Sequence, residues 1–184
     1  MKELSLNILD IVENSVKAKA TLTEILISET DTTLTLTIKD DGVGMSEETL
    51  LSVTNPFYTT RTTRNVGLGI PLLIMSAEQT GGGVKITSKV ADDTDPTHGT
   101  TVVASYNKDH IDFTPLGDVV STITTLIQGH PDTDFLFRHE KGEDEVTLDT
   151  RSVKEIIEDI PINTYEVIKW IEDNLREQYE FFKN

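Results

Sequence analysis

The most informative part of this sequence is the stretch DDGVGM at residues 40–45. It follows the run Leu34–Ile38, in which apolar residues alternate with threonines, a pattern typical of a half-buried strand. Two carboxylates therefore stand at the end of a strand, beside backbone that glycine allows to bend sharply. Asp-Gly is also the commonest signal of a short hairpin, so a surface turn is the alternative interpretation. The segments on both sides favour a binding site.

Composition limits the class of protein. The chain has 184 residues, no cysteine and a formal net charge of −16. It therefore contains no disulfide, no thiolate nucleophile and no cysteine-ligated zinc, and its charge opposes binding to nucleic acid or anionic lipid. No leader and no apolar run long enough to span a bilayer is evident, so we expect a cytoplasmic protein without a membrane partner.

The periodicity predicts two parts, residues 1–110 and residues 111–184. In the first part we expect a helix over 3–19, paired strands around 25–27 and 33–39, a short helix capped by Ser46, a mobile loop over 55–66, a buried helix over 70–77, and strands over 84–90 and 100–106. This order is that of an α+β two-layer sandwich, a mixed sheet with helices on one face. The second part is expected to be mainly helical, with a hairpin around Gly142 and helices beginning at the capping pairs Ser152/Glu155 and Asn163/Glu166.

The charge is uneven between these parts. Residues 1–110 carry 9 basic and 15 acidic residues, a net −6, and residues 111–184 carry 7 and 17, a net −10. The acidic second part is interpreted either as a cap that completes the core, which we favour, or as a docking surface for a protein partner, which would be basic.

Several polar residues match the needs of a phosphorylated nucleotide. Asp40 at a strand end is a fixed acceptor for the exocyclic amine of adenine. Asn14 and Lys17 lie on one face of the first helix with Asp10, and they would serve Mg²⁺ and phosphate. The remaining candidates are glycines before a helix, Gly67 and Gly69 with Leu68 between them, and a possible lid, Thr59, Thr60 and Arg61. The glycines form neither a P-loop nor a dinucleotide fingerprint.

The order of these motifs resembles that of a known family. Asp10-Ile-Val-Glu-Asn14-Ser-Val-Lys17 resembles an N box, Asp40-Asp-Gly42-Val-Gly44 a G1 box, Asn55-Pro-Phe57-Tyr-Thr-Thr60-Arg61 an F box, Val66-Gly67-Leu-Gly69 a G2 box, and His98-Gly99-Thr100-Thr101 the closing Gly-Thr motif. The chain thus resembles the ATP-binding domain of histidine kinases, gyrase B subunits, Hsp-type chaperones and MutL proteins, the GHKL superfamily with its Bergerat fold.

The resemblance implies ATP and Mg²⁺ as cofactors and a role for each matching residue. Asn14 would hold Mg²⁺, Lys17 would contact phosphate, Asp40 would read adenine, and Thr100 would support the adenine end of the pocket. The other implied ATP-binding residues shape the pocket or form its lid; they are Gly42, Gly44, Met45, Phe57, Thr59, Thr60, Arg61, Gly67, Leu68 and Gly69.

Two departures concern catalysis. Asp10 occupies the position where hydrolytic relatives carry a glutamate base, and its shorter side chain predicts slow hydrolysis, since a misplacement of about 1 Å can cost on the order of a hundredfold in rate. A sensor kinase also has a phosphoacceptor histidine before its N box, whereas His98, His110, His130 and His139 all follow it here. We expect these four to be ordinary surface histidines.

We consider three functions. The first is a regulatory kinase or slow ATPase that acts on a separate partner protein, with Asp10 as base; small anti-sigma serine kinases of the superfamily act in this way. The second is an ATP sensor without turnover. The third, a MutL-like DNA clamp, fits neither the charge nor the length.

The tail of the chain has a resemblance of its own. It resembles that of small ATP-binding proteins encoded near iron-hydrogenase operons, through Pro115–Asp118, Leu148–Arg151 and Pro161–Ile171. A homodimer is a further possibility.

Overall fold

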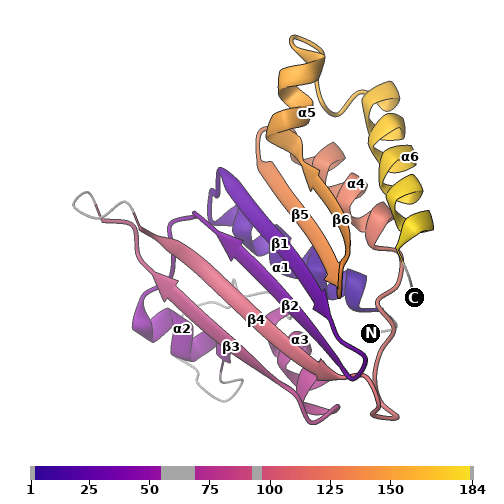
Figure 1. Cartoon of the computed structure of the whole chain (residues 1–184). Coiled ribbons are helices and arrows are strands. Elements are labelled where there is room, and N and C mark those ends of the chain that lie inside the picture. Colours follow the sequence, from indigo (N-terminus) through magenta and orange to yellow (C-terminus); the bar gives the residue numbers. More distant parts are fainter. Residues whose placement is uncertain (1–2, 55–68, 93–96, 183–184) are drawn as a thin grey trace.

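The computed structural model describes residues 3–54, 69–92 and 97–182. The described part of the chain forms six helices and six strands, and the strands follow one another in three consecutive pairs (Figure 1). The helices are α1 (Leu4–Lys17), α2 (Glu47–Thr54), α3 (Gly69–Glu78), α4 (Val119–Gly129), α5 (Thr150–Ile157) and α6 (Tyr165–Phe181). The strands are β1 (Leu22–Glu29), β2 (Thr33–Asp40), β3 (Gly83–Lys89), β4 (Gly99–Asn107), β5 (Asp134–Lys141) and β6 (Asp144–Asp149).

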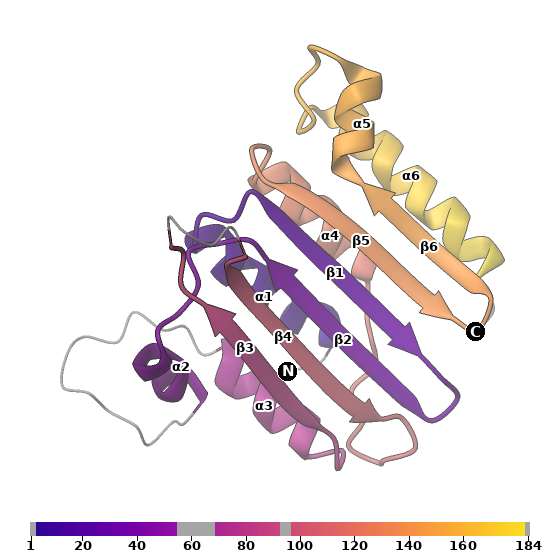
Figure 2. The same ribbon diagram turned by 60° about the vertical axis from the view of Figure 1, so that its left-hand side comes forward.

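All six described strands form one sheet in the order β3-β4-β2-β1-β5-β6. Every pairing is antiparallel except that of β1 with β5, which is parallel, and the helices lie on one face of the sheet (Figures 1 and 2). The predicted α+β architecture, a mixed sheet with helices on one face, is confirmed.

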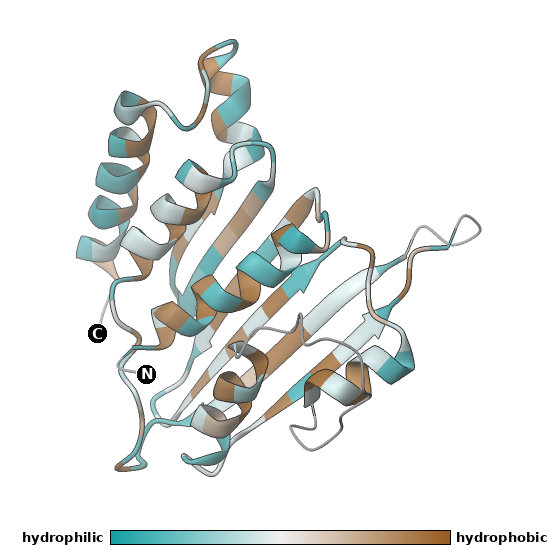
Figure 3. Ribbon diagram, turned by 180° about the vertical axis from the view of Figure 1, so that it is seen from behind, coloured by the Kyte–Doolittle hydropathy of each residue, from teal (hydrophilic) through white to brown (hydrophobic). Residues whose placement is uncertain are grey.

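Side-chain alternation explains why the helices cover only one face. In β2, Leu34, Leu36 and Ile38 are buried while the threonines between them are partly exposed. In α1 the apolar stripe predicted from the sequence is buried at Ile8, Ile11 and Val12. Figure 3 shows the hydrophobic colour of the helices turned toward the sheet. Sheet and helices thus share one apolar core.

The core does not stop at residue 110. Phe135 and Phe137 of β5 are buried at 1% and 0% exposure in the same cluster as Ile25 and Ile27 of β1. The parallel β1–β5 ladder, from Leu22 opposite Asp134 to Glu29 opposite Lys141, extends the sheet into the second part of the chain. The division into two domains at residue 110 stays a prediction, but the sheet itself crosses that point.

The structure corrects two predicted helix starts and the predicted surface position of one histidine. Helix α5 begins two residues before Ser152, because Asp149 at the end of β6 accepts the backbone N–H of Arg151 at 3.0 Å and caps the helix earlier. Helix α6 follows Thr164 and not Asn163, because the backbone turns there through the bond from Thr164 N to Pro161 O. His139 is not a surface histidine: it is 3% exposed.

None of the helices described in the structure is both long and apolar enough to cross a bilayer.

Candidate functional site

Asp40 ends β2 with its carboxylate on the buried, helix-covered face. The burial pattern of β2 places Asp40 in line with Leu36 and Ile38, and only 9% of the residue is exposed. One carboxylate oxygen, Oδ2, accepts the hydroxyl of Ser15 at 2.7 Å. The other, Oδ1, accepts the backbone N–H groups of Gly42 at 3.0 Å and Thr100 at 3.2 Å. Three donors therefore fix the orientation of the carboxylate.

This arrangement leaves capacity for a fourth donor. An ionised carboxylate has about four acceptor positions. Two of them lie on Oδ1 and are occupied by Gly42 and Thr100, while Oδ2 uses one of its two positions for Ser15. Asp40 can therefore accept one more hydrogen bond, from a group that enters through the exposed part of the residue.

Ser15 and Thr23 are site residues that sequence reasoning missed. Ser15 is 2% exposed and follows Asn14 directly, but a serine after a helical asparagine gives no signal of its own. Thr23 lies opposite Asp40 in the β1–β2 ladder, and its fully buried hydroxyl has no hydrogen-bond partner in the described structure. A buried hydroxyl without a partner is costly, so this position is suited to a ligand or to a bridging water.

Asp41, unlike Asp40, forms hydrogen bonds with the start of β1 and the residue before it. Its carboxylate accepts the backbone N–H of Thr21 at 2.7 Å and of Leu22 at 2.9 Å, together with the hydroxyl of Thr21 at 2.5 Å. Partial burial raises the pKa of the Asp41 carboxyl, but the hydrogen bonds from Leu22 and Thr21 outweigh it and leave the pKa below its usual value. Asp41 thereby ties the glycine turn to the start of β1.

Glycine is required where this turn meets its neighbours. Gly44 has φ +70°, and a Cβ there would lie 1.9 Å from the carbonyl oxygen of Lys89. Gly99 has φ +116°, and its Cβ would lie 1.9 Å from the carbonyl oxygen of Asp40. At Gly42, a Cβ would meet Ala18 O at 2.8 Å. The glycines thus permit a close approach of backbone to backbone around Asp40.

Hydroxyl groups join the turn to the outer strands. The backbone N–H of Met45 donates to Ser88 Oγ at 2.8 Å, and this oxygen lies 2.8 Å from the hydroxyl of Thr100. His98 Nδ1 lies 2.7 Å from the carbonyl oxygen of Gly42, which requires that this nitrogen carry the proton. Met45, Thr100 and Asp40 are therefore parts of one hydrogen-bonded end of the sheet.

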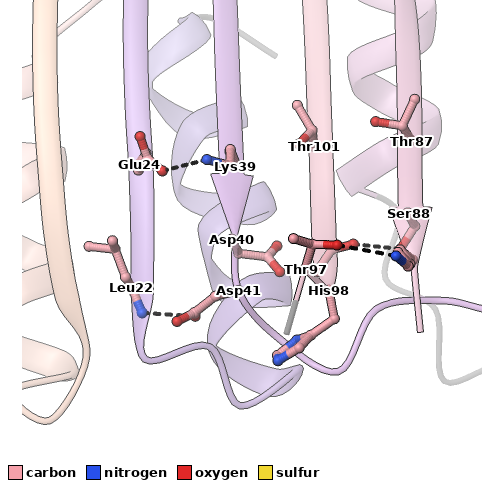
Figure 4. A pocket seen from close by; sticks show the side chains of 12 residues that line it. Leu22, Glu24, Lys39, Asp40, Asp41, Thr87, Ser88, Thr97, His98 and Thr101 are labelled. Carbon is pink, nitrogen blue, oxygen red and sulfur yellow. Dashed lines mark hydrogen bonds and ion pairs between the residues drawn. The ribbon is translucent and has the colours of Figure 1, made fainter. Parts of the chain in front are cut away.

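A cavity of about 580 Å³ opens at the same end of the sheet (Figure 4). Its walls include Thr87, Thr101 and the ion pair of Lys39 with Glu24, at 2.9 Å. Lys39 and Thr101 alternate with the buried Ile38 and Val102, so the cavity lies on the face away from the helices. Asp40 and Asp41 also line the cavity, and the Asp40 carboxylate is bonded to Ser15 of α1 on the helix-covered face.

Helix α1 carries the other predicted residues. Asp10 and Lys17 are exposed and Asn14 is half-buried, and the side chain of Asn14 has no hydrogen bond within the described residues. Gly69, the first residue of α3, lies against Asp10, where a Cβ on Gly69 would be 3.0 Å from the Asp10 Cβ. The structure therefore brings Asp10, Asn14, Asp40 and Gly69 into one region around α1.

The remaining predicted residues lie outside the described part of the chain. These are Phe57, Thr59, Thr60, Arg61, Gly67 and Leu68, together with the loop predicted over 55–66. Among the residues that are described, no group of three or more His, Asp or Glu side chains could hold a metal ion.

Comparison with known proteins gives matches in sequence and in structure. Residues 2–110 match the family described as histidine kinase-, DNA gyrase B- and HSP90-like ATPases. Sporulation kinase C of Bacillus subtilis (strain 168) is 30% identical over 83 residues, which are 44% of this chain and 19% of that protein. The chain thus spans about a fifth of the length of this relative.

The solved structures extend the likeness of fold beyond residue 110. The N-terminal domain of a DNA repair protein matches with a TM-score of 0.59 at 13% identity, over 81% of this chain and 53% of that chain. The Aquifex aeolicus MutL ATPase domain complexed with ADP matches with a TM-score of 0.52 at 16% identity, over 85% and 69%. Residues 2–110 are 109 of 184, so both matches must include residues of the second part.

The family match covers more than half of the chain, and the fold agrees with it. The chain belongs to the family of histidine kinase-, DNA gyrase B- and HSP90-like ATPases.

Proposed function

We propose that this protein binds ATP at Asp40 and acts on a separate protein partner as a regulatory kinase or slow ATPase. The observation that carries the proposal is the buried Asp40 carboxylate, held by Ser15, Gly42 and Thr100 with one acceptor position left. The exocyclic amine of adenine is a donor that fits this position, whereas guanine presents a carbonyl oxygen there. A site of this kind rejects a base that leaves its buried groups unpaired.

The unpartnered hydroxyl of Thr23 supports the same pocket. It lies across the ladder from Asp40 on the buried face, where the edge of a bound purine or a water beside it would provide the missing hydrogen bond. The histidine kinase-like relative and the ADP complex of the MutL domain agree with a nucleotide ligand.

Asn14 and Lys17 would serve the phosphates and Mg²⁺. Magnesium usually keeps several waters and needs few protein oxygens, so the free amide oxygen of Asn14 is a suitable ligand. Lys17, exposed in the last turn of α1, would offset phosphate charge. When bound, Mg²⁺ neutralises charge on the transferring phosphoryl group. The residues present therefore fit the Mg²⁺–ATP that the family implies.

Asp10 is the candidate base. It is exposed on α1, and Gly69 at the start of α3 lies against its Cβ. Its carboxylate would accept the proton of the attacking hydroxyl of a partner or of water. Since the aspartate is one methylene shorter than glutamate, we expect slow hydrolysis and favour transfer to a positioned partner group.

The second candidate function is an ATP sensor that binds without turnover and changes affinity for a partner. The short Asp10 side chain is the observation that favours it. DNA binding is opposed by the net charge of −16, and the proposal places the protein in the cytoplasm with a protein partner, as a monomer or homodimer.

Calorimetric titration with Mg²⁺–ATP, repeated with Mg²⁺–GTP, tests the pocket. We expect ATP binding in the micromolar to millimolar range and no GTP binding; equal affinity for both would contradict the role of Asp40. Phosphate release and transfer, measured on the wild type and on Asp10→Ala, then separate the two functions. Loss of turnover in the variant supports catalysis, and absence of turnover in both proteins supports the sensor.

A further inference from the structure

The corner formed by α5, the following turn and the start of α6 exposes large apolar side chains. Ile156 is 72% exposed, Ile160 55%, Tyr165 76% and Trp170 49%. We call these four residues the α5–α6 corner. Scattered apolar residues are normal on a surface, but four large ones within the fifteen residues 156–170 form an unusual concentration. Figure 3 shows hydrophobic colour along this turn.

The corner is held rigidly by the residues between its exposed ones. Ile162, Val167 and Ile171 are buried at 4%, 8% and 0% exposure. Backbone bonds from Ile160 N to Ile157 O and from Thr164 N to Pro161 O fix the turn. The outward side chains are therefore presented by an ordered scaffold.

Acidic side chains that form no ion pair belong to the same segment as the corner. Residues 152–170 contain 2 basic and 4 acidic residues, a net −2. Both basic residues are already paired: Lys154 with Asp134 at 2.7 Å and Lys169 with Asp173 at 2.7 Å. Among the described residues of this segment, the carboxylates that form no ion pair are those of Glu155, Glu158, Asp159 and Glu166.

We propose that the α5–α6 corner is a docking surface for a basic, amphipathic segment of a partner protein. Such a segment brings apolar side chains to Ile156, Ile160 and Trp170 and cations to the unpaired carboxylates of the same segment. A second copy of this chain would bring the same negative charge, and an anionic membrane would repel it, so both occupants are disfavoured. The docking does not depend on the proposed nucleotide activity.

The corner lies at the same end of the sheet as Asp40. Helix α5 follows the last residue of β6, at the end where β1 begins and β2 ends. Three hydrogen bonds connect the regions: Thr21 N to Asp41 at 2.7 Å, Asp134 N to Thr21 O at 2.8 Å, and Lys154 to Asp134 at 2.7 Å. A partner held at the corner is thus kept on the end of the sheet that carries the candidate site (Figure 1).

Trp170 is the single tryptophan of the chain and reports directly on the corner. The probe is a synthetic amphipathic helix of leucine and lysine without tryptophan or tyrosine, titrated in buffer without nucleotide. We expect saturable binding with a blue shift of the Trp170 emission. An otherwise identical peptide with glutamate in place of lysine is expected not to bind.

Variants locate the binding. The double variant Ile156→Ser with Ile160→Ser is expected to weaken binding roughly tenfold, about the effect of losing one strong interface contact. Glu155→Gln with Glu166→Gln is expected to weaken it several-fold and to reduce its salt dependence. The matched control is Ile111→Ser, which removes an apolar side chain that is 95% exposed between β4 and α4 and is expected to change nothing.

Four results would overturn the proposal: no saturable binding of the lysine peptide, equal binding of both peptides, an equal loss in Ile111→Ser and the double variant, or unchanged binding in the double variant. Sedimentation that shows a dimer abolished by the double variant would assign the corner to a second copy. A blue shift with anionic vesicles alone would assign it to a membrane.

Discussion

The two ends of strand β1 use carboxylates in different ways. At the Leu22 end, Asp40 is held by a hydroxyl and two backbone N–H groups, all of them neutral donors. At the Glu29 end, the Glu29 carboxylate accepts the ammonium group of Lys108 at 2.5 Å and His139 Nε2 at 3.0 Å. One end thus orients a negative charge, and the other end neutralises it.

The second end joins the two parts of the chain. Glu29 lies on β1, Lys108 follows β4, His139 lies on β5, and Tyr179 of α6 reaches His139 Nδ1 at 2.8 Å. The hydrogen bond from His139 and the charge of Lys108 outweigh burial and lower the pKa of the Glu29 carboxyl to about 2. Burial and the nearby charge of Glu29 raise the pKa of the Tyr179 hydroxyl.

The proton positions at this end follow from the partners. Glu29 is ionised, so His139 Nε2 carries a proton and donates it. Burial keeps the Tyr179 hydroxyl protonated, and its oxygen lies 2.8 Å from His139 Nδ1. The comparison teaches that a carboxylate paired with a cation stabilises the fold, whereas a carboxylate oriented by neutral donors keeps its charge and one acceptor position for a ligand.

The largest effect is expected from Asp40→Asn. An asparagine can keep its oxygen toward the Gly42 and Thr100 N–H groups and turn its amide toward Ser15, which can accept a hydrogen bond. The fold should therefore survive, while the remaining acceptor becomes a donor that opposes the adenine amine. Calorimetry should show at least a roughly hundredfold loss of ATP affinity, since a site built on hydrogen bonds discriminates strongly.

Asp31→Asn is the matched control, because it changes an exposed carboxylate in the turn at the opposite end of the β1–β2 hairpin. Its ATP affinity should equal that of the wild type. Unchanged ATP affinity in Asp40→Asn would show that the Asp40 carboxylate does not bind the nucleotide, and its contrast with Glu29 would then fail.

Glu29→Gln should lower the free energy of unfolding and leave ATP affinity unchanged. Removing the charge leaves Lys108 without its ion-pair partner at a site where the Glu29 side chain is 14% exposed. We expect a loss of roughly 2 kcal/mol in the free energy of unfolding, a value reduced to allow for partial contact with solvent. Urea denaturation measures it, and ATP affinity of the folded variant should be unchanged. A fall in ATP affinity would show that the two ends are coupled.

The pH dependence of this stabilisation has a defined sign. The pKa of Glu29 falls from 4.5 to about 2 on folding, so its contribution is complete above pH 4.5 and is lost as the pH falls toward 2. The stability difference between wild type and Glu29→Gln should therefore shrink over this interval. Denaturation curves at several pH values test it, and a difference that grows on acidification would contradict the assigned ion pair.

The smallest effect is expected from Ser15→Ala. It removes one of the three donors to Asp40 and leaves Gly42 and Thr100 in place, a loss of about 1 kcal/mol, or roughly fivefold in ATP affinity. Calorimetry measures the change, with Ser5→Ala as a control on the same helix, since Ser5 bonds Glu3 and not Asp40. An unchanged affinity would mean that the Ser15 hydroxyl does not help to orient the carboxylate.

The local sequence pattern was sufficient to predict helices and strands in residues 1–110. The spacing of Ile8, Ile11 and Val12 predicted α1, and the threonine alternation predicted β2, because helical and strand periods are properties of neighbouring residues. Gly44 and Gly99 could be recognised as turn residues for the same reason. The resemblance to the ATPase family rested on this local information.

Helix starts in the second part were less predictable. Ser152 and Asn163 looked like caps, but Asp149 caps α5 and the backbone turn before Tyr165 precedes α6. Several polar residues near a helix start compete for the same N–H groups, and the end of the preceding strand decides among them.

By itself the sequence determined the helical and strand spacing of the apolar residues, the turns, and the residue types at the end of β2. Only the tertiary structure decided that β5 pairs with β1, that Ser15 meets Asp40 across 25 residues, and that His139 is buried between Glu29 and Tyr179. The physical reason is that periodicity shows which side of an element is buried but not what covers it. Strand neighbours and buried hydrogen bonds are selected by the packing of the whole core.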